Sequence, residues 1–200
     1  PILTNTFLHT LTGSVAVGRL LATQCAQQGK KMSAELGGHA PVIICEDANI
    51  DFAIQQSIPA KFRNAGQVCA SPIRFMVHKN HYEQWLDLFV AQTKKLKLGN
   101  GLDASSQMGP LTHAGRVSDI QNFVTDAKDK GAEIVCGGQR LDRLGYFFEP
   151  TVITQAPHHS RVMQEEPFGP IALIQPFEDL TQAIQMANRS EERRVGKECL

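Results

Sequence analysis

The 200-residue sequence predicts an α/β fold in which a parallel sheet lies between layers of helices. Short apolar segments alternate with longer segments of helical period, which is the pattern of alternating strands and helices. Some of the apolar segments carry no polar position, as expected of strands that are buried on both faces. The hydrophobic fraction of 42% is that of a globular chain with a sizeable core.

The first third of the chain is expected to form two strands, each followed by a helix. Residues 6–12 favour a strand, and residues 14–28 favour a helix because apolar side chains recur there at roughly helical spacing. These side chains are Val15, Val17, Leu20, Leu21 and Cys25. Residues 41–45 read as a short buried strand and residues 50–64 as an amphipathic helix. The intervening segment, with Glu35, is expected to be a loop.

The rest of the chain continues the alternation. A long helix is expected over residues 81–98, with Asn80 as its N-cap, and a Gly- and Pro-containing loop over residues 99–112. A turn at Gly137-Gly138 separates two further strands. The remaining expected elements are strands at 75–78, 133–136, 151–153 and 171–176 and helices at 113–130 and 180–188.

Composition excludes several classes of function. Twenty Lys and Arg balance twenty Asp and Glu, so no global field draws the chain to nucleic acid or to an anionic membrane. No apolar run approaches the ~20 residues that span a bilayer, and a basic signal-peptide start is absent, so we expect a cytoplasmic protein. Five cysteines without a C-x-x-C pair and scattered histidines predict neither a disulfide framework nor a metal site.

The two ends of the sequence look unusual. The chain opens at Pro1 without Met, which suggests that the numbering begins inside a larger protein. Residues 189–200 form a charged burst without apolar period, and they resemble the translation of a sequencing adapter. We expect this tail to be non-native; the alternative is an ordinary solvated charged tail.

Gly13 and Ser14 are the first candidates for ligand binding. A strand runs into a helix there, and the free amides at a helix N-terminus form an anion site. The segment only approaches a P-loop, because Arg19-Leu20 stands where a P-loop carries Lys and Ser or Thr. Taken alone, Ser14 could equally be an N-cap without a ligand.

Three further segments carry reactive side chains or a rigid turn. Glu35 precedes two glycines that permit a sharp turn, and Cys69 follows Gly66 in a loop where a thiolate can form, with Arg63 six positions earlier. Glu165 and Glu166 open a turn stiffened by two prolines and a glycine. Taken singly, these could be a solvated carboxylate, a packed cysteine and a rigid connection.

Together these segments resemble the successive motifs of the NAD(P)-dependent aldehyde dehydrogenase family. The motifs are Thr12-Gly13-Ser14 with Gly18, Glu35-Leu36-Gly37-Gly38, Gly66-Gln67-Val68-Cys69 and Glu166-Pro167-Phe168-Gly169-Pro170. Their order and spacing also resemble the family's, with 34 positions from Glu35 to Cys69 and 97 from Cys69 to Glu166. The resemblance runs from about Phe7 to Asn188. It implies that residues 1–34 end a Rossmann-like NAD(P)-binding domain and that residues 35–188 form the parallel-sheet catalytic domain.

The resemblance also implies roles for individual residues. Cys69 would be the nucleophile and Glu35 the base that activates the hydrolytic water. The contacts to NAD or NADP would come from Gly13, Ser14, Leu36, Glu166 and Phe168. The family's upstream Asn, which helps to bind the oxyanion, and its later oligomerisation segment have no match among these residues. The parent protein is expected to be a homo-oligomer.

The substrate class follows from a narrower resemblance. Segment 61–67 is similar to the succinate semialdehyde dehydrogenase branch, in which the arginine that matches Arg63 anchors the distal carboxylate of the substrate. The alternative is an arginine on the exposed face of its helix. Leu11 and His39 depart from the usual family residues, and Ser71 stands where some members of the branch carry a second cysteine.

Two other functions stay open at this point. Cys69 and Glu35 could serve a thiol esterase or acyltransferase without redox chemistry. The chain could also be an inactive fragment whose only property is association through apolar surface that is normally covered. The expected partner of the complete enzyme is a small-molecule aldehyde, and neither nucleic acid nor a membrane.

Overall fold

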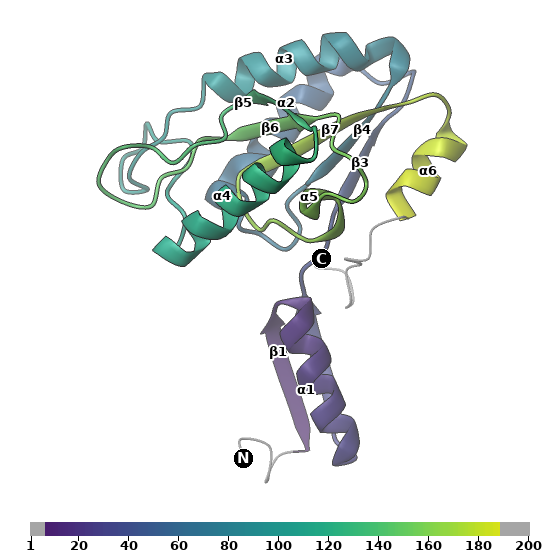
Figure 1. The fold of residues 1–200 in the computed structure, drawn as a ribbon, viewed down its shortest axis with the longest axis vertical. Helices are drawn as coiled ribbons and strands as arrows, with labels where there is room; N and C mark the ends of the chain where they lie inside the picture. Colours follow the sequence, from purple (N-terminus) through teal and green to yellow (C-terminus); the bar gives the residue numbers. More distant parts are fainter. Residues whose placement is uncertain (1–6, 189–200) are drawn as a thin grey trace.

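The computed structural model describes residues 7–188, and it arranges them around two separate sheets (Figure 1). The smaller sheet is the parallel pair β1 (Leu8–Gly13) and β2 (Lys31–Leu36), joined by helix α1 (Val15–Gln27). The larger sheet has the order β3 (Pro41–Ile44), β4 (Arg74–His78), β7 (Ile171–Phe177), β6 (Thr151–Thr154) and β5 (Glu133–Cys136). An α/β fold is therefore confirmed.

Helices cover both faces of the larger sheet (Figure 1). Helices α2 (Ile50–Phe62) and α3 (Tyr82–Lys94) lie on one face, and α4 (Ala114–Asp129), the single-turn α5 (Arg161–Gln164) and α6 (Leu180–Asn188) lie on the other. Alternate residues of β4 point into the two layers. Phe75 packs against Phe89 of α3 with ring centroids 5.0 Å apart, whereas Met76 packs against Ala183 of α6.

The larger sheet is mainly parallel, as predicted, and only its edge strand β5 departs from the prediction. Strand β5 runs antiparallel to β6, while the other neighbouring pairs are parallel. A parallel connection needs a crossover of a dozen or more residues, usually a helix. The chain between Cys136 and Thr151 contains no helix, and it returns through the left-handed Gly137 and Gly138.

Two local predictions are wrong. Glu35 lies in strand β2 and not in a loop; the sequence of β2 alternates between exposed and half-buried positions and therefore lacks an apolar run. Asn80 does not cap α3, because it lies inside a 3-10 turn over Lys79–His81 and His81 takes the N-cap position. The side-chain Nδ2 of Asn80 instead donates to Glu46 Oε1 at 2.8 Å.

The unit formed by β1, α1 and β2 leaves apolar side chains exposed. Phe7, Leu8, Val17 and Leu20 are all largely open to solvent. Its own packing rests on Gly18, where an added Cβ would lie 2.5 Å from Leu36 Cδ1, so the helix sits close against β2. No helix within residues 7–188 is long and apolar enough to cross a membrane. The predicted tail, residues 189–200, lies outside the described residues.

Candidate active site

The segments singled out in the sequence lead into three neighbouring strands of the larger sheet. Residues 37–40 lead into β3, residues 63–73 into β4 and residues 165–170 into β7. Because β3, β4 and β7 are adjacent and parallel, these segments meet at one edge, the amino edge. The Ile73 amide donates to Ala40 O at 3.0 Å, and the Leu173 amide donates to Ile73 O at 2.8 Å.

The smaller sheet brings the first motif to the same place. In its parallel register Thr12 is opposite Glu35 and Gly13 is opposite Leu36. The carboxyl ends of β1 and β2 therefore carry Gly13, Ser14, Glu35 and Leu36 together, and residues 37–40 connect this end directly to β3. The carboxyl ends of parallel strands are the usual ligand-binding edge of α/β sheets.

Ser14 and Gly13 form an open helix start. The Ser14 side chain accepts a hydrogen bond from the Val17 amide at 3.4 Å, so it is the N-cap of the thirteen-residue helix α1. Both residues are exposed. The helix N-terminus can therefore meet an anionic group from solvent.

Glu166 packs directly against the Glu35 motif. A Cβ added at Gly37 would lie 1.7 Å from Glu166 Oε2, so only glycine permits the half-buried Glu166 carboxylate to lie there. Two residues later Phe168 takes a positive φ of 40°, a conformation that costs free energy and is held by its surroundings. The Arg116 guanidinium lies 5.7 Å from the centroid of the Phe168 ring.

Cys69 lies in a turn with an unusual backbone before it. Asn64, Ala65 and Gly66 all have positive φ, at 52°, 54° and 70°. The Gln67 side chain ties this turn down, since Nε2 donates to Asn64 O at 2.9 Å and Oε1 accepts from the Thr112 amide at 3.0 Å. Cys69 itself is half-buried, so the thiol is not sealed in the interior.

Gly66 joins the Cys69 turn to the Glu166 segment. A Cβ added at Gly66 would lie 2.1 Å from the carbonyl oxygen of Gly169. The two segments therefore touch backbone to backbone. All four motifs are therefore connected by contacts. The Gly13 motif pairs with the Glu35 motif as neighbouring strands, and the Glu35 motif contacts Glu166 at Gly37. The Cys69 motif contacts the Glu166 segment at Gly66.

Gly66→Ala should destabilise this chain by about 2 kcal/mol or more, because it adds a left-handed alanine and a clash with backbone. The free energy of unfolding in urea measures the effect. Gly101→Ala is the matched control, since a Cβ at Gly101 has no heavy atom within 4 Å, and it should change the stability by about 0.5 kcal/mol or less. Equal effects of the two substitutions would contradict the close contact.

Three basic side chains, those of His39, Lys61 and Arg74, are buried beside these motifs. Arg74 is buried at the start of β4 and donates to the carbonyl oxygens of His39, Met186 and Ala187, each at 2.9 Å. Burial, together with the charges of Arg74 and Lys61, lowers the pKa of His39 to about 3, although a hydrogen bond with the Val162 backbone opposes the shift. His39 is therefore neutral at neutral pH and adds no charge to the site.

Lys61 is the residue here that sequence reasoning missed. It lies in the last turn of α2, its side chain is fully buried, and its Nζ donates to Ser71 Oγ at 3.3 Å. The available signal was a lysine on the buried side of a helix, eight positions before the candidate nucleophile. Arg63, two residues later, is exposed at the end of α2. Its role stays a prediction.

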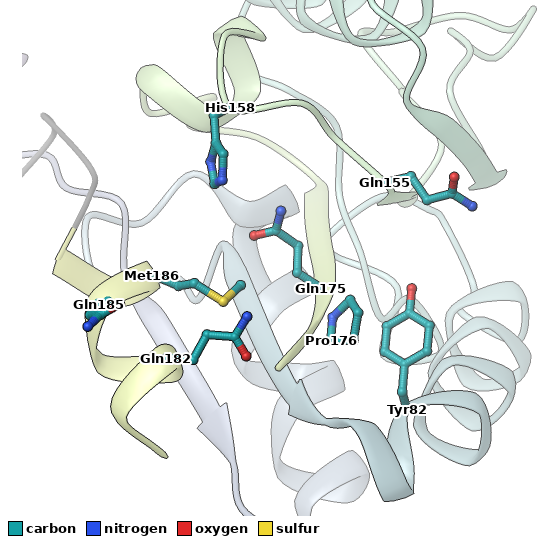
Figure 2. Close-up of a pocket in the computed structure, with 8 residues that line it drawn as sticks. All are labelled: Tyr82, Gln155, His158, Gln175, Pro176, Gln182, Gln185 and Met186. Carbon is teal, nitrogen blue, oxygen red and sulfur yellow. The ribbon is translucent and has the colours of Figure 1, made fainter. Parts of the chain in front are cut away.

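One hollow of the surface lies apart from the predicted site residues. A cavity of about 540 Å³ near the carboxyl end of β7 is lined by Gln155, Gln175 and Gln182 together with Tyr82 and Met186 (Figure 2). None of its lining residues is one of the predicted site residues. Within residues 7–188 no group of three or more His, Cys, Asp or Glu side chains is arranged to hold a metal ion.

Comparison with known proteins decides the family. A sequence profile described as "Aldehyde dehydrogenase family" matches residues 6–196. The chain belongs to this family. The succinate semialdehyde dehydrogenase of Acinetobacter baylyi is 44% identical over 182 residues, which are 91% of this chain and 38% of that protein. The 3-sulfolactaldehyde dehydrogenase of Pseudomonas putida is 41% identical over 90% of this chain and 37% of that protein.

Solved aldehyde dehydrogenases share the fold as well. The betaine aldehyde dehydrogenase of Staphylococcus aureus, in complex with NAD+, superposes with a TM-score of 0.89 at 37% identity. The match covers 92% of this chain and 38% of that one. This chain therefore spans less than two fifths of the length of the aldehyde dehydrogenases it matches.

Proposed function

We propose that this chain supplies the cysteine-bearing part of an NAD(P)-dependent aldehyde dehydrogenase that oxidises an aldehyde to its carboxylic acid. One observation carries the proposal: the helix start at Gly13, the carboxylates of Glu35 and Glu166 and the turn of Cys69 belong to segments that contact one another at a single place. In this proposal residues 1–34 end the cofactor domain and residues 35–188 form the catalytic domain. The pairing of Glu35 with Thr12 and of Leu36 with Gly13 supports a site that both parts share.

The first half-reaction takes place on Cys69. Its thiolate attacks the aldehyde carbon to form a carbon–sulfur bond, and the negative charge moves to the former carbonyl oxygen, which accepts a hydrogen bond from the Cys69 amide. NAD(P)+, when bound, supplies the hydride acceptor that makes this step an oxidation. Loss of hydride from the former aldehyde carbon leaves a thioester on Cys69.

The second half-reaction returns the enzyme to its starting state. Glu35 takes a proton from a water molecule, and the resulting hydroxide attacks the thioester carbon. The carbon–sulfur bond breaks and its electrons stay on sulfur, so the acid leaves and Cys69 returns to its thiolate form. Glu35 lies half-buried at the carboxyl end of β2, where it is held by a strand rather than by a mobile loop.

The residues present fit the cofactor. The exposed N-terminus of α1 with Gly13 and Ser14 suits a phosphate, and Leu36 is buried beside it against Gly18. The Glu166 carboxylate, which a side chain at Gly37 would displace, can accept hydrogen bonds from ribose hydroxyls. Phe168 is partly exposed and offers an aromatic face near the ribose.

The proposal is tested on a protein of full family length that contains residues 7–188, called here the complete enzyme. It should reduce NAD+ or NADP+ only when an aldehyde is added, as followed by the absorbance of the reduced nicotinamide. Hydrolysis of thioesters or esters without any such reduction would instead establish the esterase function and overturn the proposal.

We propose a substrate that carries an anionic group at the end away from the aldehyde. The names of two relatives, succinate semialdehyde and 3-sulfolactaldehyde dehydrogenase, denote such substrates. The exposed guanidinium of Arg63, six residues before Cys69, is a planar donor that suits a carboxylate or a sulfonate. Succinate semialdehyde is the substrate we expect.

Arg63→Ala should raise KM for succinate semialdehyde about 10- to 100-fold, because a charge-assisted bond contributes roughly 1.5 to 3 kcal/mol. Butanal, which has the same chain length and no charge, should change by less than about threefold by the same reasoning. Steady-state kinetics of the complete enzyme measures both, with Arg140→Ala on the exposed connection between β5 and β6 as the control. An equal rise for both aldehydes would remove Arg63 from substrate binding.

A further inference from the structure

The ammonium group of Lys61 is buried in a place where a purely structural side chain would be apolar. Its side chain has 0% exposure, and its neighbour Phe62 is part of the core. Moving an ammonium group out of water costs several kcal/mol unless it is paired. The reason for a lysine at this position must therefore come from the groups around its Nζ.

Those groups lie on both sides of Cys69 in the sequence. Nζ donates to Ser71 Oγ at 3.3 Å, and Ser71 Oγ in turn donates to the Lys61 carbonyl oxygen at 3.1 Å. Nζ also lies 3.2 Å from the position of a Cβ added at Gly66. Lys61 thus contacts the turn three residues before Cys69 and again two residues after it.

The same ammonium group faces the Glu166 segment. The negative charge of Glu166 acts on the Lys61 ammonium group and raises its pKa. Gly66 brings the Cys69 turn into backbone contact with the Glu166 segment at Gly169. Lys61 therefore lies where the Cys69 turn and the Glu166 segment meet. Neither segment belongs to a regular helix or strand, so the contacts between them must fix their separation.

We propose that Lys61 is a positioning residue that holds the Cys69 turn and the Glu166 carboxylate in their working arrangement. This inference rests on the proposed function, since it assigns Lys61 to the cofactor and nucleophile of that reaction. Through Ser71 it fixes the turn, and through its charge it orients the Glu166 carboxylate. Lys61 itself need not touch the substrate.

A dependence on pH follows. Burial lowers the pKa of Lys61 from 10.5 to about 7, although the charge of Glu166 opposes the shift. The other groups that face it are Ser71, which does not titrate, and His39, which is already neutral because its pKa is about 3. The positive charge that orients Glu166 is therefore lost as the pH rises through about 7, and the cofactor should bind more weakly above this pH.

Stability should change with pH in the opposite direction. The unfolded chain keeps Lys61 protonated up to about 10.5, whereas the folded chain releases the proton near 7. The unfolded state binds more protons between these values, so the contribution of Lys61 to stability rises with pH across this window. A residue that served stability alone would be better replaced by an apolar side chain.

Lys61→Met in the complete enzyme tests the inference. The Kd for NAD(P)H should rise about tenfold below pH 7, because the Lys61 charge no longer orients the Glu166 carboxylate. The dependence of this Kd on pH near 7 should disappear. The free energy of unfolding should stay equal or increase. Lys95→Met, at an exposed lysine after α3, is the control and should change neither quantity. A Kd and a pH profile like those of the unsubstituted enzyme would overturn the inference.

Ser71→Ala keeps the test decisive if Lys61→Met fails to fold. It removes the oxygen that accepts the hydrogen bond from Lys61 Nζ but leaves the charge in place. The Kd should rise severalfold while its dependence on pH near 7 remains, and an unchanged Kd would overturn the inference. Cofactor binding is measured without an aldehyde, so it tests the role of Lys61 independently of turnover. Failure of the complete enzyme to oxidise an aldehyde would instead contradict the proposed function.

Discussion

Cys69→Ala in the complete enzyme is expected to lower aldehyde turnover at least about 1000-fold, because no other group can take over the covalent step. The thiohemiacetal and the thioester both form on this sulfur. Cofactor affinity should stay within about twofold of the original value, since the contacts proposed for the cofactor come from other residues. The loss should therefore lie in kcat and not in cofactor binding.

Rapid mixing with aldehyde and cofactor, followed by mass spectrometry of the trapped protein, measures acyl-enzyme formation. Cys45→Ala is the matched control, because Cys45 is also half-buried but lies at the opposite edge of the sheet, in a hollow with His78 and Phe177. It should retain both turnover and the acyl-enzyme. A Cys69→Ala protein that still oxidises aldehyde would remove Cys69 from the role of nucleophile.

The position of Glu35 shows where sequence reasoning reached its limit. The four motifs were found from their residues, yet the strand that carries Glu35 was expected to be a loop. Within residues 7–188 strand β2 pairs with β1 alone and is partly exposed, so packing does not impose an apolar run on its sequence. The motif could be recognised in the sequence because it consists of particular residues. The strand could not be recognised, because its conformation depends on pairing with β1, which the sequence of β2 does not reveal.

The sheet and its helices followed the sequence more closely because burial controls them. Residues 171–174 of β7, and Trp85 and Phe89 of α3, are fully buried, and the strand and the helix that carry them were predicted. The direction of β5 depends instead on the length and course of the connection after it. Lys61 was missed for a related reason: a charge in the interior is understood only from the groups that surround it in space.

Glu35→Gln should leave the first half-reaction of the complete enzyme intact and slow the second. The amide keeps the shape of the side chain at the end of β2, but it cannot accept the proton of water. Removal of a general base typically costs about 10²- to 10⁴-fold in rate. The first turnover should therefore still release one equivalent of reduced nicotinamide as a burst, and later turnovers should be slowed by that factor.

Stopped-flow absorbance separates the burst from the steady state, and it distinguishes the two roles that Glu35 could have. If Glu35 only activated the Cys69 thiol, the burst itself would slow in Glu35→Gln and no thioester would accumulate, which would overturn the assignment to deacylation. Glu83→Gln, at an exposed carboxylate in α3, should behave like the unsubstituted enzyme. Recovery of steady-state turnover by a small added nucleophile such as hydroxylamine, which attacks the thioester without a base, would show that the missing group is the one that activates water.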